Sequence, residues 1–92
     1  MILRFRHRGL KRFFEDDDPR GLNPQHLEII ARILARLDRA ERPQDMNLPG
    51  WRLHPLKADY AGFWSVTVRA NWRIIFRFQK ADATDVDYLD YH

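Results

Sequence analysis

The spacing of apolar residues changes once along this chain of 92 residues, and that change limits its fold more than any other feature. From Leu27 to Leu37, apolar residues recur every three to four positions, which is typical of a helix with one buried side. After a loop at 43–50 the period becomes two, which predicts strands. Because the helices come first and consecutive hairpins last, we expect an α+β fold. Two N-terminal helices would pack on one face of an antiparallel sheet and leave the other face open and basic.

The main helix is bounded by residues that favour helix ends. Asn23 is a good cap and Pro24 suits the first helical position, whereas Pro43 requires the helix to have ended before it. All elements are expected to belong to one domain spanning residues 1–92. In chain order the predicted elements are a strand at 2–8, a helix at 9–15, an acidic breaker at 16–22, the main helix from Asn23 to 40–42, and strands at 51–56, 63–69, 72–78 and 84–91.

The composition excludes several classes of protein. The chain has no cysteine, which removes disulfides and cysteine-ligated metals and fits a reducing cytosol. No apolar run approaches the roughly 20 residues of a membrane span, and residues 1–10 alternate charged and apolar side chains, unlike a signal peptide. The four histidines lack metal-ligand spacing. The sequence therefore predicts a cytoplasmic protein with no membrane, metal or cofactor in its function.

Charge is distributed unevenly along the chain. Residues 1–80 carry 16 basic and 9 acidic side chains, whereas residues 81–92 carry four acids and no base. Thirteen of the bases are arginine, which suits bidentate phosphate recognition and stacking on nucleobases. A nucleic-acid partner is one interpretation of this bias, and an arginine-rich, GC-rich genome is the other.

Basic residues and a histidine fall on the sheet face that the helices are expected to leave open. Arg73 and Arg77 alternate with apolar residues in one predicted strand, and His54 in another joins them by the same parity. Each also has a structural explanation. A strand histidine is often satisfied within the core, and Arg73 would have a structural role if it formed an ion pair with Asp85 or Asp87.

Six residues together suit one reaction, the cleavage of RNA without a metal ion. The 2′-hydroxyl attacks the adjacent phosphate, so the site needs a base, an acid and cations that stabilise the charged phosphorane. Histidine is the natural base or acid near neutral pH, and lysine and arginine serve the phosphate. Taken alone, Lys57 could also be an ordinary basic residue of a loop, and His92 could be part of a solvated tail or the remnant of a tag. The six candidates are His54, Lys57, Arg73, Asp90, Tyr91 and His92.

Four stretches also follow a known pattern, in which an LHPLK segment is followed by NWR and a final DYH. They are FRHRGLKRFFE (5–15), MNLPGWRLHPLK (46–57), GFWSVTVRANWRIIFRF (62–78) and DVDYLDYH (85–92). Over nearly its whole length the chain resembles the HigB-type toxins of the RelE/ParE superfamily. The resemblance implies a small α+β toxin that cleaves mRNA in the A site of the translating ribosome. It also implies a HigA-like helix-turn-helix antitoxin, through which alone the toxin meets operator DNA.

The resemblance further assigns roles to the matching positions, and the chain departs from the family pattern in two places. Ala58 stands where many relatives have glycine, which would stiffen the loop after Lys57. The acidic segment at 16–21 would either repel RNA or contact the antitoxin. The resemblance implies catalytic roles for His54, Asp90, Tyr91 and His92 and phosphate-facing roles for Lys57 and Arg73.

Two other functions remain open on the sequence. One is a toxin of the same fold that inhibits gyrase by binding it. Such a toxin would not need the set His54, Asp90 and His92. A simple nucleic-acid-binding domain would explain the arginine bias but not the acidic last segment. We therefore expect a metal-independent endoribonuclease toxin, with these two functions as alternatives.

Overall fold

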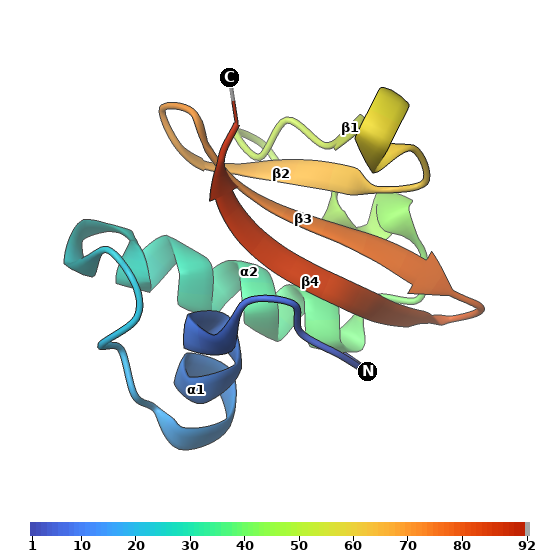
Figure 1. The fold of residues 1–92 in the computed structure, drawn as a ribbon. Coiled ribbons are helices and arrows are strands. Elements are labelled where there is room, and N and C mark those ends of the chain that lie inside the picture. The colour runs from blue at the N-terminus through green and yellow to red at the C-terminus, as the bar shows by residue number, and fades with distance from the viewer. Residues whose placement is uncertain (92) are drawn as a thin grey trace.

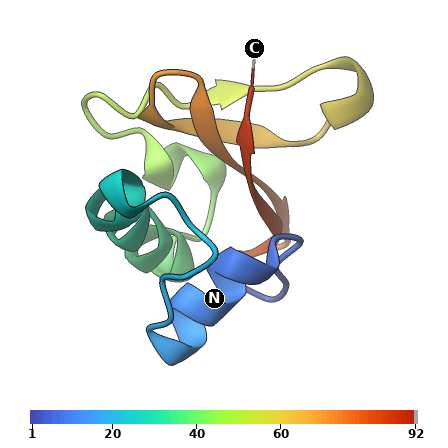
Figure 2. The same ribbon diagram turned by 60° about the vertical axis from the view of Figure 1, so that its left-hand side comes forward.

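Two α-helices pack on one face of a four-stranded antiparallel sheet (Figure 1). A computed structural model describes residues 1–91, so His92 lies outside the described residues. The sheet order is β1-β2-β3-β4, so every strand pairs with its neighbour in sequence. This confirms the expected α+β class, and a second view shows both helices on the same side of the sheet (Figure 2). The elements are α1 (Arg8–Asp16), η1 (Pro24–His26), α2 (Leu27–Arg39), η2 (Pro43–Met46), β1 (His54–Pro55), η3 (Ala58–Tyr60), β2 (Trp64–Arg69), β3 (Trp72–Gln79) and β4 (Asp82–Asp90).

The main core lies between α2 and the sheet. The helix buries Ile30, Ile33, Leu34 and Leu37, the face that the three-to-four spacing predicts. Fully burying a side chain of this size stabilises the fold by about 1.5–3 kcal/mol before the entropy of ordering is subtracted. From the sheet, Val66, Ile74, Phe76 and Val86 meet this helix face without exposed surface. No helix among residues 1–91 is long and apolar enough to cross a membrane.

Both helices begin at other residues than the sequence predicts: α2 begins later, and α1 begins earlier. The Asn23 side chain accepts a hydrogen bond from the Gln25 amide at 2.9 Å, as a cap does, but Pro24–His26 form a 3₁₀ turn and α2 starts only at Leu27. The shorter helix starts at Arg8, because the His7 ring nitrogen Nδ1 accepts from the Leu10 amide at 3.2 Å and caps it.

The predicted strand at 2–8 is wrong as a continuous strand. Only Ile2 and Phe5 form bridges, both parallel to β4, and Arg8 already belongs to α1. The pairing is interrupted because β4 bulges at Asp85, whose φ is 52°. Figure 1 shows this N-terminal segment in blue beside β4.

The predicted strand at 51–56 shortens to His54–Pro55, and the predicted loop at 43–50 contains the turn η2. Arg52 has a left-handed φ of 51°, which breaks the extended backbone before β1. Pro55 has no N–H to donate, which limits pairing at this strand. The last strand begins at Asp82 rather than at 84 and ends at Asp90.

The sheet face away from the helices, called the open face below, carries a small apolar cluster of its own. Leu56, Phe63 and Ile75 are buried there, with Tyr60 and Leu89 packed against them. The segment from Leu56 to Phe63 thus covers part of this face, and the basic residues lie around it.

Candidate functional site

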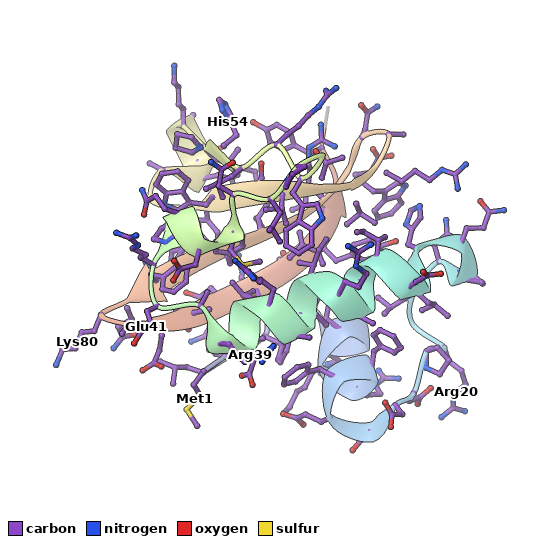
Figure 3. All side chains as sticks on the ribbon, turned by 180° about the vertical axis from the view of Figure 1, so that it is seen from behind. Met1, Arg20, Arg39, Glu41, His54 and Lys80 are labelled. Atoms are coloured by element: carbon purple, nitrogen blue, oxygen red, sulfur yellow. The ribbon has the colours of Figure 1, made fainter. Side chains whose placement is uncertain are left out.

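A pocket of about 330 Å³ opens on the open face beside β1. Three of the six residues expected from the sequence line it: His54, Arg73 and Tyr91. His54 is exposed and lies on the far side of the sheet from the helices (Figure 3). The complete lining is Arg52, Leu53, His54, Leu56, Ser65, Thr67, Arg73 and Tyr91.

Strand register brings these residues together from distant parts of the chain. His54 pairs with Ser65 across β1 and β2, and Thr67 pairs with Arg73 across β2 and β3. Paired residues of an antiparallel sheet point to the same face, so all four lie on the open face. The alternation that predicts Arg73 and His54 on one face is therefore confirmed.

Arg73 is held at the turn between β2 and β3. Its Nη1 donates to the carbonyl oxygen of Ala70 at 2.6 Å and to that of Trp72 at 3.2 Å. The prediction of an ion pair between Arg73 and Asp85 is wrong. Arg77 makes this ion pair instead, with an N–O distance of 2.7 Å. Arg73 lines the pocket, and the remaining N–H groups of its guanidinium suit an oxygen anion.

Tyr91 continues past β4 and reaches the same turn. Its backbone N–H donates to the Asn71 carbonyl at 2.8 Å, which fixes the chain one residue beyond the strand. Tyr91 is 38% exposed, and the centroid of its ring lies 6.2 Å from that of Tyr60, edge to face. An exposed aromatic ring in a pocket of this kind provides a surface on which a base can stack.

The other three candidates lie differently. Asp90 pairs with Trp72 in the register, which assigns its position to the helix-facing side of the sheet, and it does not line the pocket. Lys57 is exposed, two residues after β1, and directly precedes the turn η3 outside the lining. His92 lies outside the described residues. The structure therefore brings His54, Arg73 and Tyr91 together in one pocket, whereas Lys57 and Asp90 lie outside its lining.

Sequence reasoning missed two hydroxyl groups in the pocket wall. Ser65 and Thr67 lie on β2 between His54 and Arg73 in the register. Among residues 1–91, Thr67 Oγ1 has no protein hydrogen-bond partner although it is buried. The alternation of β2 was the available signal, since it predicts which of its residues share the face of Arg73.

A buried aromatic and histidine cluster supports the sheet from the other side. His26 Nδ1 and the Tyr88 hydroxyl lie 2.6 Å apart, and the Trp72 and Tyr88 rings stack with centroids 4.6 Å apart. The His7 ring meets Tyr88 edge-on at 5.4 Å. Because Trp72 pairs with Asp90, this cluster fixes the end of β4 that precedes Tyr91.

Burial sets the ionisation of this cluster. It lowers the pKa of His26, which is 3% exposed, and the nearby charge of Arg69 lowers that pKa further. Burial likewise lowers the pKa of His7, although the Asp87 carboxylate acts in the opposite direction. The pKa of the Tyr88 hydroxyl is raised by burial. Burial therefore favours the neutral form of both imidazoles, which pack against Tyr88 of β4.

Within residues 1–91, no group of three or more His, Asp or Glu side chains is arranged to hold a metal ion. The chemistry available at the pocket is that of an exposed imidazole, a fixed guanidinium, two hydroxyls and a phenol ring. Such groups bind a phosphodiester and move protons at it.

Comparison with known proteins gives a consistent result. A family model described as the RelE-like toxin HigB of type II toxin–antitoxin systems matches residues 3–92. The chain is 45% identical to a Proteus vulgaris protein named endoribonuclease HigB, over the full length of both. It is 34% identical to Toxin HigB-1 of Vibrio cholerae, over its whole length and 98% of that protein. The chain with this pocket thus belongs to the HigB-like family of RelE-like toxins from type II toxin–antitoxin systems.

Proposed function

We propose that this toxin is an endoribonuclease that cleaves mRNA on the translating ribosome. The observation that carries the proposal is the convergence of His54, Arg73 and Tyr91 on one pocket of the open face. The name of the Proteus vulgaris relative, endoribonuclease HigB, supports the same activity. A binding toxin would not require an imidazole, a guanidinium and a phenol around one pocket.

The proposed reaction is attack of a ribose 2′-oxygen on the adjacent phosphorus. The new O2′–P bond forms as the P–O5′ bond breaks, giving a cyclic phosphate and a free 5′-hydroxyl. One group of the site takes the proton from the 2′-hydroxyl, and another gives a proton to the departing 5′-oxygen. We propose His54 as one member of this pair and His92, which follows Tyr91 in the sequence, as the other. Asp90 belongs by its register to the helix-facing side of the sheet, so it is the weaker candidate for direct proton transfer.

The remaining residues stabilise and position the substrate. Arg73 faces the phosphate, where charge increases in the transition state, and its two backbone contacts keep the guanidinium in place. Lys57 contacts a flanking phosphate from the loop after β1. Tyr91 stacks on a base and so aligns the bond to be cleaved.

Family membership gives the toxin an antitoxin partner. We propose that this partner is a HigA-like helix-turn-helix protein and that operator DNA is met only through it. The ribosome presents mRNA in its A site, so the toxin acts in the cytoplasm. The arginines of the outer α2 face, Arg32, Arg36 and Arg39, border a hollow with Leu48 and Trp51 and are suited to contact ribosomal RNA.

The decisive experiment maps mRNA ends in translating cells that express the wild type, His54→Ala or a chain lacking His92. Wild-type expression should produce cuts in phase with codons, and both variants should reduce them by at least about a hundredfold, the usual contribution of a proton-transfer group. Circular dichroism should show that both variants keep the fold. Gyrase supercoiling is measured in parallel, and intact mRNA together with inhibited gyrase would contradict the proposal.

A further inference from the structure

Three arginines gather on the open face at the end away from the pocket. Arg77 lies four residues beyond Arg73 on β3, roughly 13 Å farther along a strand that rises about 3.3 Å per residue. Arg4 and Arg6 reach the same place from the N-terminal segment beside β4. The guanidinium carbons of Arg6 and Arg77 lie 5.7 and 5.6 Å from the centroid of the Phe63 ring.

Positive charge exceeds negative charge in this cluster. The Asp85 carboxylate is shared, because Arg77 contacts it at 2.7 Å and Arg4 at 3.2 Å. Asp87, paired with Ile75 in the register, adds a second carboxylate on this face, but three guanidinium groups still outnumber the two acids. The side chains of Arg77 and Arg4 remain 46% and 73% exposed, so an external anion can reach them.

A row of aromatic rings connects this cluster to the pocket. Tyr91 lines the pocket and lies 6.2 Å from Tyr60, which lies 6.1 Å from Phe63. Phe63 in turn lies beneath Arg6 and Arg77. Proteins that bind single-stranded nucleic acid combine positive charge along the backbone with aromatic rings that stack on bases.

We infer that Arg6 and Arg77, held over Phe63, form a phosphate-binding subsite for the substrate RNA strand, a few nucleotides from the cleaved bond. This inference rests on the proposed function, because it takes the strand in the pocket to be RNA. A ring beneath a guanidinium fixes its plane and leaves the edge N–H groups of Arg6 available for phosphate oxygens. Arg77 already donates from Nε and Nη2 to Asp85, at 3.0 and 2.7 Å, and contributes its charge and its remaining N–H groups. The substrate strand then runs from Tyr91 past Tyr60 to the arginines.

The test measures binding of 2′-O-methyl RNA oligonucleotides, which lack the attacking hydroxyl and are not cleaved, to the purified toxin without ribosomes. Affinity should rise once the oligonucleotide is long enough to extend beyond the pocket in one direction. Arg6→Gln should remove that gain, by about threefold or more for one phosphate contact, and leave the affinity of the shortest oligonucleotide unchanged. Arg12→Gln, at an exposed position of α1 on the other side of the sheet, is the matched control and should keep the gain (Figure 2).

Arg77→Gln is a second variant, and its fold is checked by thermal unfolding because Arg77 also contacts Asp85. The subsite is overturned if the affinity of the Arg6→Gln protein still rises with oligonucleotide length as much as that of the wild type. A duplex RNA that competes as well as the single strand would also overturn it, because the surface would then bind structured RNA.

Cleavage of mRNA in a translating extract is measured with the same protein samples. A wild type that cleaves mRNA but shows no gain with length overturns the subsite alone. A wild type that shows the gain but cleaves nothing overturns the proposed function instead.

Discussion

Ala58 carries a backbone conformation that its side chain disfavours. Its φ is 54°, in the left-handed region, directly after the phosphate-facing candidate Lys57. A residue with a Cβ pays about 1–2 kcal/mol there, whereas glycine does not. A glycine at this position would adopt the same turn without that cost.

Ala58→Gly should raise the free energy of unfolding by about 0.5–1 kcal/mol, since relief of strain exceeds the added chain entropy of glycine. Denaturant unfolding measures the change. Ala61→Gly is the matched control, because Ala61 has an ordinary φ of −54° and its replacement should be destabilising. Equal effects of the two substitutions would show that φ at residue 58 is not strained.

The two supporting histidines make stability depend on pH. Burial lowers the pKa of His7 and of His26 in the folded chain, so the unfolded chain takes up protons first as the pH falls below about 6.5. The stability from these groups is complete above that pH and decreases on acidification.

Unfolding at about pH 7.5 and about pH 5.5 should therefore show a lower stability at the acidic value, and His26→Gln should make this difference smaller. Tyr88→Phe removes the hydroxyl partner at 2.6 Å but keeps the imidazole, so the pH difference should persist. A His26→Gln protein with the wild-type difference would exclude His26 as the source.

At the scale of elements, α1 packs against the acidic breaker through two glycines. A Cβ built on Gly9 would lie 2.8 Å from the Gly21 carbonyl oxygen and 2.8 Å from His7 Cε1. Both distances are shorter than real Cβ contacts, and the first involves backbone that cannot rotate away. The close approach therefore fixes the start of α1 against the backbone of the breaker at Gly21.

Gly9→Ala should destabilise the fold by about 1–3 kcal/mol through overpacking, although the same change in an open helix is stabilising. Lys11→Ala, at an exposed position of the same helix, should stay within about 0.5 kcal/mol of the wild type. Thermal unfolding of the two variants decides the matter, and a stabilised Gly9→Ala protein would contradict the packing described.

Periodicity predicted the elements well where one period held over a long segment. Periodicity correctly predicts the buried face of α2 and the alternation of β3. The alternation in turn places Arg73 on the open face. Periodicity failed at 2–8 and 51–56, where the left-handed residues Asp85 and Arg52 interrupt pairing without any sequence signal.

The candidate site was predictable in part for the same reason. The parity of two strands predicts the meeting of His54 and Arg73, whereas the place of Tyr91 depends on its backbone bond to Asn71. The hydroxyl of Thr67 becomes visible as a site residue only when burial and hydrogen bonding are known.

At the scale of the whole molecule, acids of the last segment form ion pairs with the N-terminal segment and with β3. Asp85 binds Arg4 and Arg77, and Asp82 lies 3.4 Å from the amino group of Met1. These acids hold the N-terminal segment against β4. The surplus of arginine elsewhere, including the outer face of α2, is then left for external anions.

Affinity for ribosomes should consequently fall steeply as salt is raised from about 50 to about 200 mM. The double variant Arg32→Gln with Arg39→Gln should reduce the slope of log affinity against log salt by about 1–2. Arg20→Gln is the control, because Arg20 already pairs with Asp18 at 2.9 Å. A slope that is equal in all three proteins would exclude the α2 face from ribosome binding.

The contacts of residues 2–6 with β4 also determine how another protein can attach. Backbone bonds from Leu3 to Ala83 and from Arg6 to Val86, each 2.8 Å, occupy polar groups along that border of the sheet. At the opposite border β1 has only two residues, one of them Pro55. Within residues 1–91, neither border offers a long unpaired row of N–H and C=O groups, so a partner has little opportunity to extend this sheet by strand addition. We therefore expect an antitoxin to recognise mainly side chains on the surfaces of the helices and the open face.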